Sequence, residues 1–146
     1  MTENNLQKLE KLVNSELTSR IQKSQINYKE LLFEINEEDL IEIIQFLKSN
    51  DKCKFKQLID IVGVDYPEDE KRFQLIYLLL SHEHNLRIKI KIQLAVNQII
   101  NSITKIFPSA NWMEREVFDM YGIKFKNHPD LRRILTDYNF KGHPLR

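Results

Sequence analysis

One run of the chain, residues 112–135, combines carboxylates, cations, aromatic rings and a His-Pro pair. Carboxylates beside an imidazole are groups that general acid–base catalysis uses. Glu116 and His128 could serve as acid and base, with Glu114 and Asp119 as further carboxylates. An enzyme of this kind needs a concave pocket around these groups, and pKa values shifted by burial or by unpaired charge.

The spacing of the run argues against catalysis and for a helix. Asn111 is a good N-cap, and Glu114 stands where its carboxylate can bond back to that cap. Arg115 and Asp119 are one turn apart and should form an ion pair on the helix surface. Gly122 suits the left-handed turn that ends many helices. Carboxylates satisfied by helix neighbours in this way are poor candidates for catalysis.

The sequence motifs for nucleotide, metal or cysteine chemistry are weaker. Gly63, Gly122 and Gly142 are too scattered to form a phosphate-binding glycine loop. The segment His82-Glu83-His84 could present two imidazoles on one face, but it lacks a third metal ligand nearby, so a solvated turn explains it better. Cys53 is the only cysteine, which excludes an internal disulfide and an iron–sulfur cluster held by this chain alone. We interpret Cys53 as a small packed side chain.

Two groups of cations could bind anions. Arg87, Lys89 and Lys91 alternate along a predicted strand, where a solvated outer face explains them more simply than a phosphate site. The segment 122–146 is more strongly basic. Its cations outnumber its carboxylates: Lys124, Lys126, Arg132, Arg133, Lys141 and Arg146 against Asp130 and Asp137. Phe125, Tyr138 and Phe140 lie among them, and this mixture fits either an RNA-binding segment or, in preference, an anchor for another protein.

Several helices can be predicted from periodicity as the elements that position these groups. Apolar residues at helical spacing predict helices over residues 6–21, 37–47, 96–107 and 112–121. The second of these has Asn36 as its expected N-cap and acidic residues in its first turn.

Strands are predicted where apolar residues alternate or run together. Residues 28–35 and 86–94 alternate, whereas residues 72–80 are almost continuously apolar, as in a strand covered on both faces. The strands of residues 72–80 and 86–94 should form a hairpin around residues 81–85. Residues 55–66 are ambiguous, and we predict a short helix followed by a short strand there.

This order of elements indicates an α+β fold of two layers, with a mixed or antiparallel sheet and helices packed on one face. We expect a core domain of residues 1–121, which includes the helix of residues 112–121, followed by an extended basic arm of residues 122–146.

The bulk composition is that of an ordinary globular domain. The 146 residues are 42% hydrophobic and 29% charged, with a net charge of +1. Nothing in this balance suggests a nucleic-acid or anionic-membrane partner. The longest apolar run, residues 75–80, is far shorter than the roughly 18 residues of a membrane-spanning helix. The N-terminal residues lack the features of a secretory signal, so we expect the chain to remain where it is made.

Four ordered motifs resemble a known family. They are ERE at residues 114–116, DMYG at 119–122, HPDLRRIL at 128–135 and GHPLR at 142–146. Together they closely resemble the signature of the C subunit of the proton-pumping NADH:quinone oxidoreductase, respiratory complex I, also called the thirty-kilodalton subunit. Family members continue with a basic and aromatic tail after the last motif, whereas this chain ends at Arg146.

The resemblance implies a scaffold and assembly protein in the peripheral arm, without catalytic activity of its own. The complex transfers electrons from NADH to quinone and couples this transfer to ion translocation. Flavin and iron–sulfur clusters are expected on other subunits. No cofactor is expected in this chain. The implied partners are chiefly the quinone-site (D) subunit, with the B and I subunits, and neither nucleic acid nor a direct membrane span is expected. The implied location is peripheral at the cell or inner membrane, on the cytoplasmic or matrix side. The implied subunit-interface residues are Glu114, Arg115, Glu116, Asp119, His128, Arg132, Arg133, His143 and Arg146.

Overall fold

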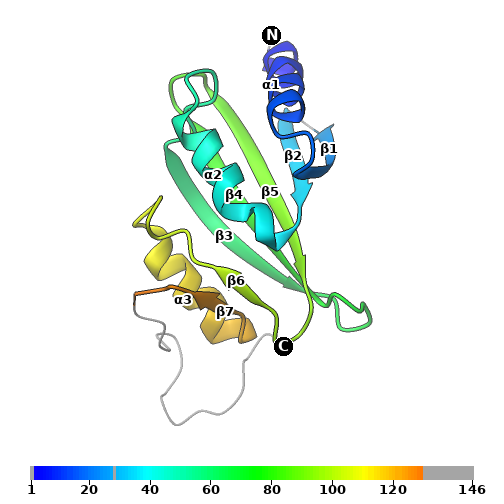
Figure 1. Ribbon diagram of the computed structural model, residues 1–146, viewed down its shortest axis with the longest axis vertical. Helices are drawn as coiled ribbons and strands as arrows, with labels where there is room; N and C mark the ends of the chain where they lie inside the picture. Colours follow the sequence, from blue (N-terminus) through cyan, green and yellow to red (C-terminus); the bar gives the residue numbers. More distant parts are fainter. Residues whose placement is uncertain (1, 28, 130–146) are drawn as a thin grey trace.

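The computed structural model describes residues 2–27 and 29–129. Its elements follow one another along the chain as strands and helices that alternate irregularly (Figure 1). They are α1 (Thr2–Glu16), β1 (Ile21–Asn27), β2 (Glu30–Ile35), the 3-10 turn η1 (Glu37–Asp39), α2 (Leu40–Ser49), β3 (Gln57–Asp65), β4 (Phe73–Ser81), β5 (Leu86–Leu94), β6 (Ile99–Asn101), α3 (Ala110–Tyr121) and β7 (Lys124–Lys126).

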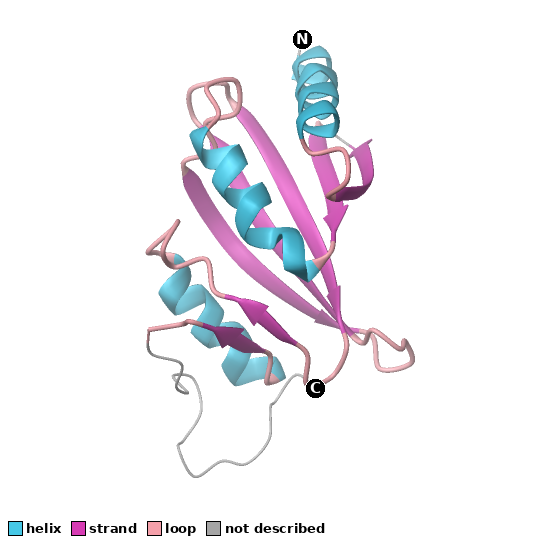
Figure 2. Ribbon diagram, viewed as in Figure 1, coloured by secondary structure: helices cyan, strands magenta, loops and turns pink. Residues whose placement is uncertain are grey.

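Five strands form one mixed sheet in the order β1-β2-β5-β4-β3. The pair β2 and β5 is parallel, and the other neighbours are antiparallel. Helices α1 and α2 lie on the same side of this sheet (Figure 2). A second, two-stranded parallel sheet of β6 and β7 lies with α3 beside β3. The predicted α+β fold of two layers is therefore confirmed.

The β4–β5 hairpin forms the centre of the sheet. Strand β5 has the predicted bounds, and its apolar residues are buried while alternate residues are more exposed. Strand β4 differs from the prediction that both of its faces are covered. Every second residue of β4 is fully buried and those between are only partly buried, because the helices cover one face of the sheet alone. Asn85 closes the hairpin turn with a positive φ of 52°.

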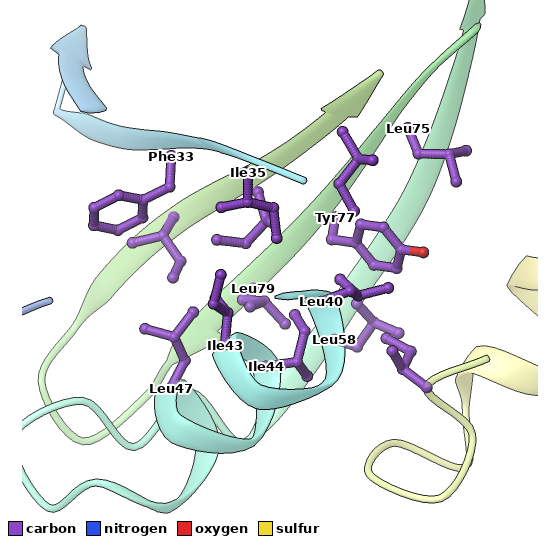
Figure 3. Close-up of a cluster of buried hydrophobic side chains, with 14 of the residues drawn as sticks. Phe33, Ile35, Leu40, Ile43, Ile44, Leu47, Leu58, Leu75, Tyr77 and Leu79 are labelled. Carbon is purple, nitrogen blue, oxygen red and sulfur yellow. The ribbon is translucent and has the colours of Figure 1, made fainter. Parts of the chain in front are cut away.

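Helix α2 supplies much of the apolar core that packs against the covered face of the five-stranded sheet. Its Leu40, Ile43, Ile44 and Leu47 are fully buried and face sheet residues such as Leu75, Tyr77 and Leu79, as Figure 3 shows. Removing one such side chain from water contributes roughly 1.5–3 kcal/mol. The predicted stripe of α2 is confirmed.

The predicted cap of α2 is wrong. The Asn36 side chain makes no capping bond, because the 3-10 turn η1 separates it from the helix proper. Its Oδ1 accepts a hydrogen bond of 2.6 Å from Gln22 of β1 instead. Asn36 thus ties the start of η1 to the edge strand.

The helix predicted over residues 96–107 is also wrong. Residues 99–101 form β6, which pairs with β7 more than twenty residues later in the chain. Ile99 is 54% exposed, whereas Ile100 and Ile103 are buried. A short strand followed by a turn therefore spaces its buried residues much as a helix would.

Strands β1 and β3 depart from the predictions as well. The predicted first helix ends at Glu16, and residue Ile21 begins β1, an edge strand whose mostly polar residues give no periodic signal. Residues 57–65 form one strand, with no helix. A bulge between Leu58 and Asp60 shifts the register against β4, and this shift disturbs the alternation that predicts a strand.

Candidate functional site around helix α3

Helix α3 carries the chemically dense run and packs against β3. It begins at Ala110, with Ser109 as its N-cap residue and no side-chain capping bond. The capping role predicted for Asn111 and Glu114 is therefore wrong. The predicted end is confirmed, because Gly122 has a φ of 76° and its amide donates to the carbonyl of Phe118 at 2.8 Å.

Glu114 points into the interior and has no exposed surface. One carboxyl oxygen accepts a hydrogen bond of 2.6 Å from the Ser102 hydroxyl, and the other accepts one of 2.9 Å from the Ile103 amide. Burial raises the pKa of Glu114 to about 7, although the two hydrogen bonds act in the opposite direction. Glu114 is therefore satisfied by the loop after β6 and not, as expected, by neighbours in its own helix.

His128 lies beside the start of α3. Its Nε2 is 2.9 Å from the carbonyl oxygen of Asn111, to which a protonated Nε2 donates, and 3.9 Å from a carboxyl oxygen of Glu114. The acid–base hypothesis paired His128 with Glu116. The structure places Glu114 beside the imidazole instead, and the Glu116 side chain is half-buried on the helix. A hollow of about 310 Å³ next to His128 has neither a carboxylate nor an imidazole in its lining, which consists of Thr104, Lys105, Pro108, Asn111, Asn127 and Pro129.

Tyr77 of β4 approaches the same carboxyl group from the sheet. Its side chain is fully buried, and its hydroxyl has no hydrogen-bond partner in the described part of the chain. Burial and, secondly, the charge of Glu114 raise the pKa of Tyr77 far above its ordinary value. Figure 3 shows the hydroxyl directed away from α2 and toward the yellow segment that contains α3. The sequence does not single out this residue, since one tyrosine in an apolar strand predicts only a core side chain.

Tyr121, in the last turn of α3, fastens the helix to β3. Its hydroxyl donates a hydrogen bond of 2.8 Å to the carbonyl oxygen of Gly63. A Cβ atom at Gly63 would lie 2.6 Å from a ring carbon of Tyr121, so only glycine fits there. The tyrosine ring also meets the ring of Phe73 edge to face, with centroids 6.2 Å apart. A glycine inside a strand was the available sequence signal for this close approach.

The outer side of α3 presents an aromatic ring and a cation. Trp112 is 54% exposed, and the guanidinium of Arg115 lies 5.6 Å from the centre of its ring. Asp119 is fully buried, so the predicted surface pair between Arg115 and Asp119 is wrong. The Nε of Arg115 is buried without a hydrogen-bond partner among residues 2–27 and 29–129. Trp112 and Arg115 are side chains of the kind that dominate protein interfaces.

The remaining interface candidates divide by location. Glu114 and Asp119 lie inside the chain, which is not where a side chain that contacts another protein is expected. Arg132, Arg133, His143 and Arg146 lie outside the described residues, so their role stays a prediction. The first part of the expected arm belongs to the folded unit, because residues 124–126 form β7 and Phe125 is buried.

The other candidate sites are occupied by ordinary contacts. In the β4–β5 turn, His82 contacts Gln57 and His84 contacts the carbonyl of Asp51, so the imidazoles have separate partners. Lys89 and Lys91 pair across the sheet with Glu30 at 3.3 Å and Glu34 at 3.1 Å. Burial raises the pKa of the Cys53 thiol to about 11, which suits a packed and unreactive side chain.

The described residues contain neither a metal-binding group nor a membrane-spanning helix. No three His, Cys, Asp or Glu side chains within residues 2–27 and 29–129 are grouped so that they could bind a metal ion together. None of the helices in this part of the chain has the length and apolar character that a bilayer crossing requires.

Comparison with known proteins gives one consistent family. A family model described as the 30 Kd subunit of respiratory-chain NADH dehydrogenase matches residues 33–146. The C subunit of NADH-quinone oxidoreductase from Wolbachia sp. subsp. Brugia malayi (strain TRS) is 63% identical over 100 residues, which are 68% of this chain and 53% of that protein. The C subunit from Mesorhizobium japonicum is 45% identical over 141 residues, 97% of this chain and 70% of its own length. The chain thus spans from about half to about 70% of these relatives.

A solved structure shares the fold. It is described as the membrane-bound sulfane sulfur reductase, an archaeal respiratory membrane complex, and one of its chains matches with a TM-score of 0.77. The match covers 90% of this chain and 77% of that chain at 20% sequence identity, so it shows similarity of fold alone.

Proposed function

Because the chain belongs to the family of the 30 kDa subunit of respiratory-chain NADH dehydrogenase, we propose that it is a non-catalytic assembly protein of an NADH–quinone oxidoreductase. In this proposal the whole complex transfers electrons from NADH to quinone and couples the transfer to ion translocation. This chain lies in the peripheral arm and holds other subunits in place. Flavin and iron–sulfur clusters belong to those other subunits.

The proposal rests on the observation that side chains of the chemically dense run hold helix α3 against the rest of the fold. Glu114 holds the loop after β6, and Tyr121 binds the backbone of β3. These side chains therefore stabilise one position of α3 against the sheet. The same helix leaves Trp112 exposed with Arg115 beside it, as a docking surface requires.

Partners follow from the family rather than from contacts in this structure. We propose the quinone-site (D) subunit as the main partner, with the B and I subunits nearby. The segment from Asp130 to Arg146 would reach across the quinone-site subunit, with Arg132 and Arg133 at the contact. The complex would be attached to the membrane through other subunits, with this chain on the cytoplasmic side in a bacterium or the matrix side in a mitochondrion.

RNA binding was the alternative from the sequence. None of the relatives described above is named as a nucleic-acid-binding protein.

Co-expression with a homologue of the quinone-site subunit tests the proposal most directly. The two chains should elute together in size-exclusion chromatography, and the purified single chain should show neither flavin nor cluster absorbance. Separate elution under several salt conditions would contradict the assembly role. Oxidation of NADH by the isolated chain would contradict the non-catalytic role.

A further inference from the structure

A small polar cluster lies between the sheet and α3 in a largely apolar interior. We name it the Glu114 cluster, and it consists of Glu114, Ser102, Tyr77, His128 and the amide of Ile103. These groups come from α3, from β4, from the loop after β6 and from the segment after β7. The cluster therefore joins four segments that are far apart in sequence.

The cluster supplies few donors to a buried carboxylate. An ionised carboxylate away from water needs a cation or several hydrogen-bond donors. Glu114 receives two hydrogen bonds, one from Ser102 and one from Ile103. The Ser102 hydroxyl is also shared with Thr104, at 2.9 Å. The Tyr77 hydroxyl adds no hydrogen bond within the described residues, and the imidazole of His128 is 3.9 Å away, beyond hydrogen-bond distance.

Two cations on the elements around the cluster are directed elsewhere. From α2, Lys48 donates a hydrogen bond of 2.6 Å to the carbonyl of Ile106 and lies over the ring of Phe107. From α3 itself, Arg115 lies over Trp112. Among the described residues, the titratable groups that face Glu114 are therefore Tyr77 from β4 and His128 from the segment after β7. A neutral carboxyl group fits these surroundings better than a charged one.

We propose that the Glu114 cluster is a proton-dependent fastener, in which neutral Glu114 holds α3 and the loop after β6 against the sheet and ionised Glu114 loosens them. The neutral carboxyl group accepts the Ile103 amide through its carbonyl oxygen, its own O–H can donate to the Ser102 hydroxyl oxygen, and no charge is left at Glu114. Ionisation places a charge there with two hydrogen-bond donors among the described residues, and the least costly response is to admit water by moving the loop or the helix. This inference does not depend on which partner the chain binds.

The direction of the pH dependence follows from the burial of Glu114. Its pKa is raised from the ordinary 4.5 to about 7 in the folded chain. Between pH 4.5 and about 7, Glu114 is therefore mostly protonated in the folded state and mostly ionised in the unfolded state. The stability contributed by neutral Glu114 is fully present below about pH 4.5 and is lost as pH rises through about 7. The unfolding equilibrium constant should increase on the order of a hundredfold from pH 5 to pH 8 through this group.

Denaturant unfolding of the full chain at several pH values tests the proposal, with Glu114→Gln as the variant. Glutamine keeps the shape and an acceptor oxygen but cannot ionise. The wild-type chain should lose stability relative to Glu114→Gln between pH 5 and pH 8. Glu116→Gln is the matched control, because Glu116 is half-buried two residues along the same helix, and its profile should follow the wild type. Parallel profiles of the wild type and Glu114→Gln, or a steeper loss in the variant, would overturn the proposal.

Hydrogen exchange provides a test that needs no variant. The Ile103 amide is bonded to Glu114, so its protection factor reports directly on the closed cluster. After correction for intrinsic exchange, protection at Ile103 should fall as pH rises from 5 to 8. The Phe33 amide in β2 is the control, because β2 pairs with β1 and β5 and contributes no residue to the cluster, and it should lose less protection over the same range. Constant or rising protection at Ile103 would reject the fastener even if Glu114→Gln failed to fold.

Discussion

At Gly63, helix α3 comes so close to β3 that the tyrosine ring of α3 occupies the space of a side chain. A Cβ atom there would be 2.6 Å from Tyr121, well inside the contact distance of two carbon atoms. The carbonyl of the same residue accepts the tyrosine hydroxyl. Glycine therefore provides both the space and the acceptor at this junction.

Gly63→Ala should destabilise the chain by about 2–3 kcal/mol, because the added methyl group forces the ring of Tyr121 away and breaks its hydrogen bond. Urea unfolding of the full chain measures this loss. The matched test is the double variant Gly63→Ala with Tyr121→Ala, in which the clash is absent. The two losses should then be clearly less than additive. Simple additivity would show that the clash is not the cause.

Glu114 is the second residue whose surroundings decide its behaviour. The difference between its pKa of about 7 and the ordinary 4.5 corresponds to about 3 kcal/mol at high pH. We therefore expect Glu114→Gln to be more stable than the wild type at pH 8 by an amount that approaches this value. Thermal unfolding in the same buffers should place the melting temperature of the variant higher at pH 8 and close to the wild type near pH 5.

Among the elements, α2 shows how one helix stabilises the sheet. Its four buried residues recur at three- and four-residue spacing and meet the covered face of β4 (Figure 3). Ile41 belongs to the same helix but is 36% exposed. Ile41 and Ile44 therefore provide a matched pair of the same residue type in the same helix.

Ile44→Ala should cost about 2–5 kcal/mol, since the truncation leaves a cavity in the core. Ile41→Ala should cost less than about 1 kcal/mol, because its side chain is already partly in water. Both substitutions change helix propensity equally, so the difference between their unfolding free energies isolates burial. Equal losses would contradict the position of α2 against the sheet.

In the molecule as a whole, the helices and the second sheet take different places around the five-stranded sheet. Helices α1 and α2 cover one face, and α3 with β6 and β7 extends the structure beside β3 (Figures 1 and 2). The HPDLRRIL motif begins at His128, and the GHPLR motif follows it in sequence. The position of His128 beside α3 thus fixes where the first of these motifs begins.

Arg132→Ala and Arg133→Ala should impair co-elution with a homologue of the quinone-site subunit while leaving thermal unfolding of the single chain almost unchanged. The reason is that a planar guanidinium suits bidentate contacts across an interface. Arg87→Ala is the control, because Arg87 is an exposed cation on β5. Co-elution should survive in the control. An equal loss of thermal stability in the single chain would count against an interface role for the two arginines.

Local chemistry and strong periodicity were enough to predict several features of the chain before its fold was known. The bounds of β5, the buried stripe of α2 and the end of α3 at Gly122 all follow from side-chain spacing or backbone preference. The ordered motifs of the C-terminal half were also sufficient to predict the family, which the family model over residues 33–146 confirms.

Contacts between distant segments account for the features that could not be predicted in this way. Strand β6 exists because it pairs with β7. Gly63 is required because the ring of Tyr121 packs against it and the tyrosine hydroxyl bonds its carbonyl oxygen. Glu114 looked like a capping residue in the sequence, since a carboxylate at that helical position can bond back to the helix start. The fold instead turns it inward to Ser102 and Ile103, where loss of water rather than local helix geometry controls its charge.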